Sequence, residues 1–310
     1  MSKLKKAVVT GGAGFIGSHL AGKLARQNYQ VTIIDDLSTG KIKNVEQLLK
    51  NDKVELVQGS VTDLSLLQKV FQGADYVFHQ AAVPSVPRSI ENPLASNEAN
   101  ITGTLNVLLA ARDNGVNKVV YASSSSVYGD TPTLPKNEDM LPNPQSPYAV
   151  SKLTGEYYCQ VFQEVYRLPT VCLRYFNVYG SRQDPNSQYA AVIPRFISLV
   201  SQGNPPIIFG DGEQTRDFTF IEDVVEANIL AGESEITGTF NIGKGENISL
   251  NRLAELVTQL LGGNIKPVHE APRPGDIRHS LASISRARNF GYIPKWGLEE
   301  GLRETIKGWL

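Results

Sequence analysis

Short apolar runs alternate with longer amphipathic stretches over roughly the first 175 residues. The runs are rich in β-branched residues, which favour strands, and the stretches between them repeat apolar positions with a helical period. Strands that alternate with helices are joined by right-handed crossovers and form a parallel, doubly wound sheet. Ligands of such a sheet bind beyond the carboxyl ends of its strands. We predict strands at 7–10, 31–35, 54–58, 76–79, 119–123 and 170–174.

The pattern changes after Gly180, where loops become rich in Pro, Gly and Asn. We expect a Rossmann-type α/β domain over residues 1–180 and a smaller α/β lobe over 181–310, with some crossing of the chain between them. A cleft between the two lobes is the expected substrate site. In the smaller lobe we predict strands near 207–209, 239–241 and 266–268, and helices near 221–231, 250–261 and 298–309.

The composition is that of an ordinary globular protein, with 310 residues, 41% of them hydrophobic and 20% charged. A net charge of −1 favours neither nucleic acid nor anionic lipid, and no apolar run is long enough to span a membrane. Glycines from Gly11 onward interrupt any signal-peptide core. We therefore expect a cytoplasmic protein with small-molecule partners. Cys159 and Cys172 lie in apolar surroundings and are expected to be reduced core thiols.

A glycine-rich turn, Gly11-Gly12-Ala13-Gly14-Phe15-Ile16-Gly17, follows the first predicted strand and opens a helix. Backbone amides at such a helix start can hold a pyrophosphate. The next strand ends in Asp35-Asp36, where a carboxylate can bond a ribose diol and would repel a 2′-phosphate. This combination predicts NAD rather than NADP, although a tight turn and a solvated helix cap would produce the same residues.

Asp63 follows another predicted strand and could reach the adenine. The alternative is that Asp63 is the N-cap of the helix that begins at Leu64, which is the commoner role for an aspartate in this position.

Tyr148 and Lys152 lie one turn apart on a helix predicted over 147–167, so they share a face. Together they can act as an acid/base device, because a nearby cation favours the phenolate form of tyrosine. Taken alone, the pair is more often a surface aromatic and a solvated cation. A row of hydroxyls, Ser123 to Ser126, ends the preceding strand at the ligand-binding edge and favours the catalytic reading.

These residues resemble the extended short-chain dehydrogenase/reductases, and among them the nucleotide-sugar 4-epimerases typified by UDP-glucose 4-epimerase. The resemblance covers essentially the whole chain. Its motifs are the glycine turn, His79-Gln80-Ala81-Ala82, the serine row with Val127-Tyr128-Gly129, Tyr148-x-x-x-Lys152, Leu173-Arg174-Tyr175-Phe176-Asn177, Gly210-Asp211-Gly212 with Thr215-Arg216-Asp217, and Arg273-Pro274-Gly275-Asp276.

The resemblance implies that Tyr148 is the base at the sugar 4-hydroxyl, and that Ser124 bonds the same oxygen. Lys152 would bind the nicotinamide ribose and lower the pKa of the phenol. Hydride would pass from C4 to tightly bound NAD and return to the other face of a 4-keto intermediate, so that NAD is regenerated. The implied cofactor contacts are Gly11, Gly14, Phe15, Ile16, Gly17, Asp35, Asp36, Val61, Asp63, Gln80, Ala81, Ala82, Asn100, Tyr148, Lys152 and Tyr175.

The resemblance also implies a UDP-sugar substrate, with two arginines on its pyrophosphate. For any one arginine alone, a surface salt bridge to Asp211 or Asp217 would be the preferred interpretation. The implied substrate contacts are Val86, Arg88, Ser124, Ser125, Ser126, Asn177, Ala191, Val192, Phe209, Arg216, Arg273, Asp276 and Ser280.

The identity of the sugar remains open at this point. Val86-Pro87-Arg88-Ser89 and Arg278-His279-Ser280-Leu281 resemble the subgroup acting on UDP-N-acetylglucosamine and UDP-N-acetylgalactosamine, and a small Ser280 leaves room for an acetamido group. The alternative is that Ser280 is a loop hydroxyl unrelated to the size of the sugar. Arg88 could bind a C6 carboxylate, which keeps a UDP-uronic acid epimerase or decarboxylase as an alternative.

Other classes are less well supported. Related dehydratases have an Asp-Glu pair where this chain has Ser125 and Ser126. A catalytically silent sensor of NAD or nucleotide sugar is disfavoured by the intact catalytic set. The four histidines lack metal-ligand spacing, so no metal is predicted, and no P-loop lysine follows the glycines. By resemblance, helices over 94–114 and 147–167 would pair with those of a second copy in a four-helix homodimer interface.

Overall fold

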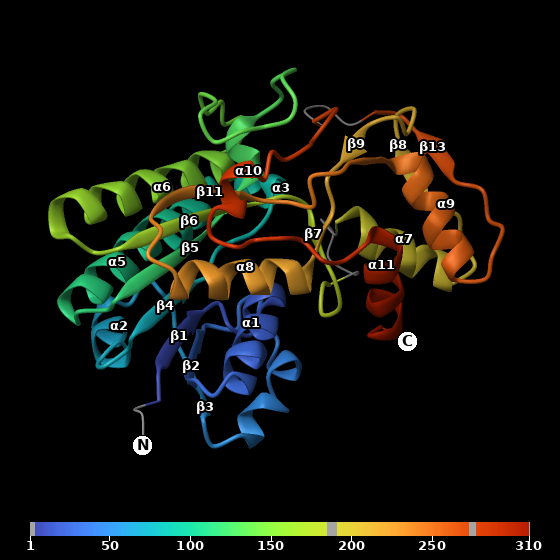
Figure 1. Cartoon of the computed structure of the whole chain (residues 1–310). Coiled ribbons are helices and arrows are strands. Elements are labelled where there is room, and N and C mark those ends of the chain that lie inside the picture. Colours follow the sequence, from blue (N-terminus) through green and yellow to red (C-terminus); the bar gives the residue numbers. More distant parts are fainter. Residues whose placement is uncertain (1–3, 185–190, 273–276, 310) are drawn as a thin grey trace.

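The computed structural model describes residues 4–184, 191–272 and 277–309. At the centre of this described part lies a parallel sheet of seven strands (Figure 1). Its order reverses next to the first strand, which creates the switch point at which doubly wound sheets bind ligands. In spatial order the strands are β3 (Val54–Gln58), β2 (Gln30–Asp35), β1 (Lys6–Thr10), β4 (Tyr76–His79), β5 (Lys118–Ser124), β6 (Thr170–Tyr175) and β11 (Gly238–Ile242).

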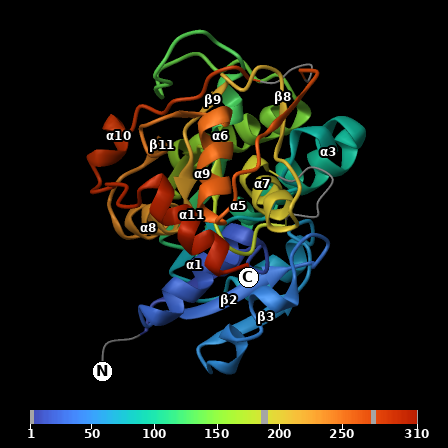
Figure 2. The same cartoon turned by 90° about the vertical axis from the view of Figure 1, so that its right-hand side faces the viewer.

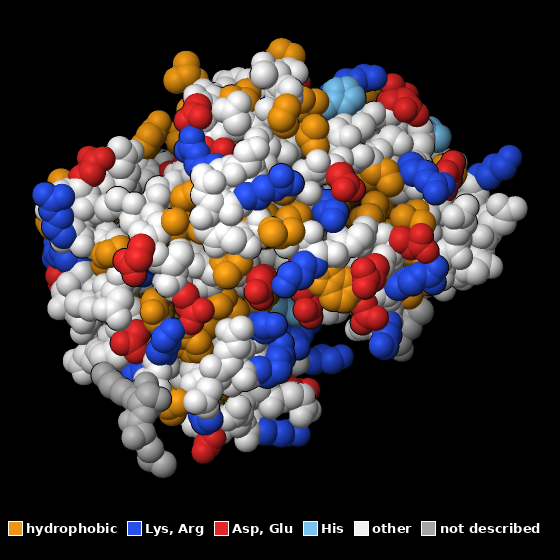
Figure 3. Space-filling model, viewed as in Figure 1, with side chains coloured by type: hydrophobic (Ala, Val, Ile, Leu, Met, Phe, Trp, Pro, Cys, Tyr) orange, Lys and Arg blue, Asp and Glu red, His pale blue; other side chains and the backbone are white. Residues whose placement is uncertain are grey.

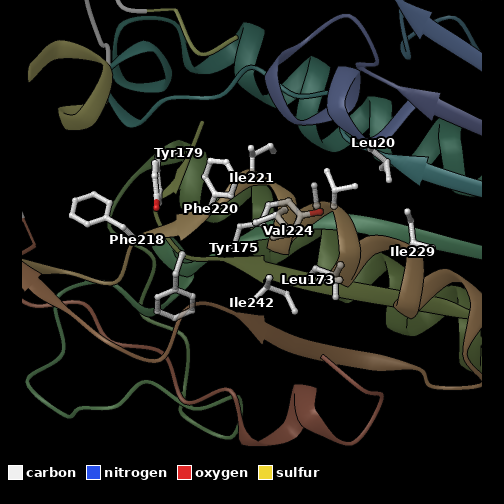
Figure 4. Close-up of a cluster of buried hydrophobic side chains, with 14 of the residues drawn as sticks. Leu20, Leu173, Tyr175, Tyr179, Phe218, Phe220, Ile221, Val224, Ile229 and Ile242 are labelled. Carbon is white, nitrogen blue, oxygen red and sulfur yellow. The ribbon is translucent and has the colours of Figure 1, made fainter. Parts of the chain in front are cut away.

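Helices cover both faces of the sheet, so alternate residues of each strand enter two different cores. In β1, Ala7 and Val9 join the core under one pair of helices, whereas Val8 joins the opposite core. Figure 4 shows the first core, where Leu20 and Ile229 face the strand residue Leu173. The helices of this first face are α1 (Phe15–Arg26) and α8 (Ile221–Glu233), and those of the other face are α2 (Leu64–Val70), α5 (Gly103–Asp113) and α6 (Pro147–Tyr166).

A further helical segment leads from the β4 end into α5. It consists of α3 (Val86–Glu91), α4 (Pro93–Asn97) and a π-helical turn at Glu98–Thr102 that continues into α5. The predicted helices at 94–114 and 147–167 are thus both present, the first with one widened turn. Short 3-10 turns occur at Ile42–Asn44, Leu48–Lys50 and Ser125–Tyr128.

The second lobe is built on short strand pairs rather than on one sheet. Figure 2 views the molecule from this side, with the C-terminal helix in front. The strand pairs are β7 (Val178–Tyr179) with β10 (Thr219–Phe220), β8 (Ile207–Phe209) with β13 (Val268–Glu270), and β9 (Thr215–Arg216) with β12 (Ile248–Ser249). The helices are α7 (Val192–Ser201), α9 (Leu250–Leu260), α10 (Ser285–Arg288) and α11 (Leu298–Lys307).

The Rossmann-type fold is confirmed, but one strand was assigned to the wrong lobe. The strand expected at 239–241 is β11, which pairs in parallel with β6 and extends the central sheet. Helix α8 covers the same sheet. The reason is that strand pairing over a long stretch of chain depends on the tertiary fold, which a local pattern does not specify. The strand expected at 266–268 begins two residues later, at Val268.

The surface and the cysteines agree with the composition. Figure 3 shows acidic and basic side chains interspersed over the visible face. Cys159 and Cys172 are both free and buried, as predicted. Among the described residues, no helix combines the length and the apolar character needed to cross a membrane.

Candidate active site

The glycine turn joins β1 to α1 at the switch point, and close backbone contacts explain its glycines. Gly11 has a φ of +66°, and a Cβ there would lie 2.6 Å from the backbone nitrogen of Ala81. A Cβ on Gly17 would lie 2.2 Å from the carbonyl oxygen of Gly11. Helix α1 begins at Phe15, and its N-cap residue, Gly14, provides no side-chain hydrogen bond. A helix start without a side-chain cap can hold a pyrophosphate, so this turn fits a dinucleotide.

Two adjacent acids at the end of β2 have different surroundings. Asp35 is buried and accepts hydrogen bonds from the backbone N–H groups of Ala13 and Leu37, both at 2.9 Å. Burial raises the pKa of Asp35 above its usual value. Asp36 is exposed and accepts from the Ser38 N–H and hydroxyl at 2.9 and 2.6 Å. Asp35 therefore connects the expected ribose site to the glycine turn.

Asp63 is the N-cap of helix α2, which is the commoner of its two predicted roles. Its carboxylate accepts a hydrogen bond from the backbone N–H of Leu66 at 3.0 Å and caps α2. Val61, just before it, is buried, and its carbonyl accepts from Asn106 at 3.2 Å. The structure thus gives Asp63 a capping role, and contact with adenine stays a prediction.

His79, at the end of β4, supports the neighbouring cofactor residues through a directed chain of hydrogen bonds. The Ala81 N–H donates to Thr10 Oγ1 at 3.3 Å, and the Thr104 hydroxyl donates to the Asn100 carbonyl at 2.6 Å. Between them the imidazole accepts from Thr10 at Nδ1 (2.7 Å) and donates to Thr104 from Nε2 (2.9 Å). Burial lowers the pKa of His79 to about 3, so it is neutral.

Two further polar clusters contain predicted cofactor residues. Gln80 donates to Tyr175 at 3.1 Å and to Asn228 at 2.9 Å, and the Tyr175 hydroxyl also donates to Asn228. Asn100 donates to Ser151 at 3.0 Å, and Ser151 donates to the carbonyl of Tyr148 at 2.8 Å. Each cluster therefore joins residues from distant parts of the sequence, the first at the carboxyl ends of β4 and β6 and the second at the start of α6. Phe15, Ile16 and Ala82 lie partly buried at the same edge.

Helix α6, which carries the predicted catalytic pair, starts where its sequence dictates. Ser146 caps it by accepting the Ala149 N–H at 3.1 Å, and Pro147 occupies the first turn. The Tyr148 N–H donates to Ser89 of α3 at 3.0 Å, which fixes the start of the helix. Tyr148 and Lys152 consequently lie on the helix face that is turned toward β5.

The pKa of Tyr148 differs from the value expected for a tyrosine beside Lys152. Lys152 is buried, its Nζ donates to the Ala122 carbonyl at 2.8 Å, and burial lowers its pKa to about 8. The ammonium lies 5.9 Å from the centre of the Tyr148 ring. We expected it to lower the pKa of the phenol. Instead burial raises the pKa of Tyr148, and a hydrogen bond with Ser124 only partly opposes the shift.

The serine row turns away from the end of β5 through the 3-10 turn. The Ser124 hydroxyl accepts the N–H of Ser126 at 3.2 Å. The Ser126 hydroxyl is buried and has no hydrogen-bond partner. A buried hydroxyl without a partner costs free energy, so Ser126 is suited to bond a ligand. Ser125 lies beside it, partly buried.

The predicted substrate residues of the second lobe lie on segments that one carboxylate holds together. Buried Asp217 accepts the backbone N–H groups of Lys244 (2.8 Å), Gly245 (3.0 Å) and Ala282 (3.0 Å). Its own carbonyl accepts from Asn177 at 3.0 Å. Burial raises the pKa of Asp217 to about 6.

Two predicted contacts flank this carboxylate. The guanidinium of Arg216 donates to the carbonyls of Thr215 (3.0 Å) and Arg278 (3.2 Å), and the Ser280 N–H donates to the Thr215 carbonyl at 3.0 Å. The salt bridge to Asp211, considered for either predicted arginine, is made by Arg278 at 3.0 Å.

The remaining predicted contacts lie farther along the second lobe and at its border with the first. Phe209 packs against the guanidinium of Arg195 at 5.2 Å. Ala191 and Val192 begin α7, and Val86 and Arg88 lie on α3. Arg273 and Asp276 fall outside the described residues. No cluster of His, Cys, Asp and Glu able to hold a metal occurs in the described ranges.

The sequence motifs include Asp217 and Arg174, but neither was assigned a role in the site, and Glu156 was not singled out. The sequence did contain a signal for Glu156 and for Arg174. Glu156 lies one helical turn after Lys152 on the same face, and Arg174 interrupts an otherwise apolar strand. A charged residue in such a strand indicates a buried partner.

Comparisons with known proteins identify the family. The family described as NAD dependent epimerase/dehydratase matches residues 7–243. UDP-glucose 4-epimerase of Mycolicibacterium smegmatis is 39% identical over 306 residues, covering 97% of each chain.

Two solved structures carry bound ligands. UDP-N-acetylglucosamine 4-epimerase of Methanobrevibacter ruminantium, in complex with UDP-N-acetylmuramic acid, is 44% identical with a TM-score of 0.95, covering 99% of this chain and 98% of that one. UDP-glucuronic acid 4-epimerase of Bacillus cereus, in complex with UDP-glucuronic acid and NAD, is 34% identical with a TM-score of 0.91, covering 98% of both. These matches span nearly the whole chain, and the protein belongs to the NAD-dependent epimerase/dehydratase family of enzymes.

Proposed function

We propose that this protein inverts C4 of a UDP-hexose through a transient 4-keto intermediate. UDP-N-acetylglucosamine and UDP-N-acetylgalactosamine are its best substrates, and UDP-glucose and UDP-galactose are also converted. The observation that carries the proposal is the meeting of Ser124, Tyr148 and Lys152 at the sheet edge beside the glycine turn. An acid/base pair beside a dinucleotide site suits oxidation and reduction of an alcohol.

In this mechanism Tyr148 removes the proton of the 4-hydroxyl as C4 loses its hydride. Ser124 hydrogen-bonds the same oxygen, and Tyr148 returns the proton after the keto sugar has turned over in the cleft. Positive charge favours the phenolate, and Lys152 is held within 5.9 Å of the Tyr148 ring to supply it. A pKa of about 8 leaves Lys152 largely protonated at neutral pH.

The residues of the first lobe fit a bound NAD. The glycine turn would hold the pyrophosphate, Asp35 the adenosine ribose, and Lys152 the nicotinamide ribose. NAD held there would supply a reversible acceptor for the C4 hydride, which would return to the opposite face of the sugar, so the reaction would need no second substrate. Tight retention of NAD follows from this cycle and is part of the proposal.

The nucleotide is proposed to bind in the second lobe. Arg216 and Arg273 would hold the pyrophosphate in a forked geometry, with Asn177 and Asp276 nearby. Val192 and Phe209 would lie near the base. The fixation of the segments around Arg216 and Ser280 by Asp217 supports this assignment.

The preference for an acetamido sugar rests on the small side chain of Ser280. The 44% identity of the whole chain to a UDP-N-acetylglucosamine 4-epimerase supports the preference. A pocket that is larger by a few atoms discriminates only modestly, about 10- to 200-fold per methylene. We therefore expect both plain and acetamido sugars to react, at different rates.

A UDP-uronic acid substrate is the second candidate, because Arg88 is near the catalytic tyrosine. It adjoins Ser89, whose hydroxyl accepts the Tyr148 N–H, and it is only partly exposed. An arginine there could bond a C6 carboxylate. The similarity to a UDP-glucuronic acid 4-epimerase supports this alternative.

We further propose a homodimer in which α6 and the helix from α4 to α5 pair with a second copy. A stripe of apolar side chains lies exposed on these helices, and such stripes are rarely left in water. It comprises Leu94 (81% exposed), Val150, Tyr157, Val161 and Val165 (64%).

The test is to incubate the purified protein with UDP-N-acetylglucosamine, UDP-glucose and UDP-glucuronate in parallel, without added NAD, and to separate the products. The proposal expects epimers of the first two, with the acetamido sugar converted faster. Exclusive conversion of UDP-glucuronate, or release of carbon dioxide from it, would favour the second candidate. Tight binding of UDP-sugars without conversion of any would indicate a sensor.

A further inference from the structure

A fully buried ion pair lies behind the catalytic residues. Arg174 of β6 donates to Glu156 of α6 twice, from Nε to Oε1 at 2.9 Å and from Nη2 to Oε2 at 2.7 Å. Both side chains are only 5% exposed. The parallel fork is the strongest geometry available to this pair of residues. It joins the catalytic helix to the central sheet at a single, well-defined point.

Each residue of the pair lies close to a residue proposed to be catalytic. Glu156 follows Lys152 by one helical turn, so both project from the same side of α6. Arg174 is the register partner of Ser123 in β5, the residue just before Ser124. The Ser123 hydroxyl donates to Glu156 Oε1 at 2.5 Å. The Glu156 carboxylate therefore bonds β5, the strand that carries Ser124. Glu156 itself lies on α6, the helix that carries Tyr148 and Lys152.

The arginine extends the same network to the turn of the serine row. Its Nη1 donates to the hydroxyl of Tyr128 at 2.8 Å, and that hydroxyl donates to Asn241 of β11 at 2.7 Å. Tyr128 is the last residue of the turn that contains Ser125 and Ser126. The guanidinium thus bonds the end of the turn that carries the serine row.

Stability alone is a poor explanation for these buried charges. Taking both ions out of water costs free energy, and well-packed apolar residues in place of a buried pair are often as stable or more so. Apolar residues cannot supply directed bonds to Ser123 and Tyr128. Fixed direction matters where reacting groups must be held to about 0.5 Å. What the pair adds over an apolar core is orientation.

We propose that Glu156 and Arg174 are positioning residues that hold Ser124 at its working distance from Tyr148 and Lys152. They touch neither substrate nor cofactor and act through Ser123, Tyr128 and the backbone. A displacement of about 1 Å at a catalytic group can lower a rate roughly 100-fold. The inference rests on the proposed epimerase function, because it concerns the geometry of that reaction.

Three variants test it in the full-length enzyme. Ser123→Ala removes only the link to the serine strand, Glu156→Gln removes the charge, and Glu156→Leu with Arg174→Met replaces the pair by apolar residues. Thr305→Val is the matched control, because it removes a buried hydroxyl that donates to Gly301 at 2.7 Å in α11, away from the site. The readouts are kcat, KM for the UDP-sugar, bound NAD and melting temperature.

We expect kcat to fall about 3- to 30-fold in Ser123→Ala and 10- to 100-fold in the other two, with KM and bound NAD within about twofold of the parent. Thr305→Val should change the melting temperature as much as Ser123→Ala does and leave kcat unchanged. The inference is overturned if kcat of Ser123→Ala and Glu156→Gln stays within twofold of an active parent, or if the loss appears in KM. It is also overturned if a folded double variant has the kcat of the parent. An inactive parent would instead overturn the proposed function, and the inference with it.

Discussion

The two halves of this protein hold their functional residues in opposite ways. Around Tyr148 the predicted site residues lie at the ends of the parallel strands of the central sheet. Buried side chains such as His79 and Glu156 each make hydrogen bonds to two other residues there. In the second lobe the strands are two or three residues long, and one carboxylate, Asp217, holds two separate segments, one at Lys244 and Gly245 and the other at Ala282. The difference indicates that the sheet fixes the residues proposed for the chemistry, whereas the residues proposed to contact the sugar and the nucleotide lie around a single anchor.

The largest expected effect tests the catalytic half. Tyr148→Phe removes the proton acceptor but leaves the ring, so kcat should fall about 100- to 10,000-fold. Bound NAD and melting temperature should stay close to those of the parent, because the ring is kept and the loss is limited to the hydrogen bond with Ser124. Product chromatography and absorbance of the released cofactor provide the measurement. A near-normal rate would remove Tyr148 from the mechanism.

The next effect tests the second lobe. Asp217→Asn replaces the carboxylate that accepts three backbone N–H groups, so the segments that carry Arg216 and Ser280 should loosen. We expect KM for the UDP-sugar to rise about 10-fold or more, with kcat changed far less, since a lost charge-assisted bond costs about 1–3 kcal/mol. Exposed Asp211→Asn is the matched control and should leave KM within about twofold. A fall in kcat alone would show that the two halves are not separate.

A smaller effect concerns the sugar. Ser280→Leu should lower kcat/KM for UDP-N-acetylglucosamine relative to UDP-glucose, by roughly 10-fold, because it fills space proposed for the acetamido group. Ser280→Ala should leave the ratio unchanged. Competition assays with both sugars measure the ratio directly. An equal loss for both sugars would mean that Ser280 does not select by size.

The smallest effect is on how the free energy of unfolding changes with pH. The folded state keeps His79 neutral down to a pKa of about 3, whereas the unfolded chain protonates near 6.5. Its contribution is therefore fully present above pH 6.5 and is lost as the pH falls toward 3, roughly 2 kcal/mol of it by pH 5. His79→Gln should lower stability at pH 7 and make it less sensitive to acid. Denaturant titrations at several pH values test this, and an unchanged slope between pH 6.5 and 5 would contradict it.

Asp217 should have the opposite dependence. Its pKa is raised to about 6, so in the folded protein the neutral form is favoured between that value and its ordinary one. Its contribution to stability should therefore increase as the pH falls from 6 toward 4. The measurement is the free energy of unfolding of Asp217→Asn and of the parent over that pH range. The Asp217 contribution should rise as the pH falls, whereas the His79 contribution should fall.

The sequence predicted the fold of the first half well because local signals agree there with the global arrangement. The six predicted strands all exist, and the glycine turn, Asp35 and the serine row lie at strand ends as expected. Helix α6 begins at its Ser-Pro cap. Strong periodicity and capping residues act over short distances, so they can be read from the chain itself.

The sequence was less informative wherever distant segments meet. It did not place β11 beside β6, and it did not show that Asp217 would bind backbone groups of two later segments. Similarly, it indicated that Lys152 would lower the pKa of Tyr148, but the burial that raises this pKa depends on the packed structure. Side-chain burial and backbone hydrogen bonds between remote residues are products of the tertiary fold, which no local pattern encodes.

The measurement that tests the account most directly follows the hydrogen on C4. UDP-N-acetylglucosamine carrying deuterium at C4 is incubated with the enzyme in ordinary water until both epimers are present. A hydride that leaves C4 and returns to the same carbon keeps its label, so we predict full retention of deuterium at C4 in the product. Epimerised product in which the C4 deuterium has exchanged with water would contradict the proposed mechanism.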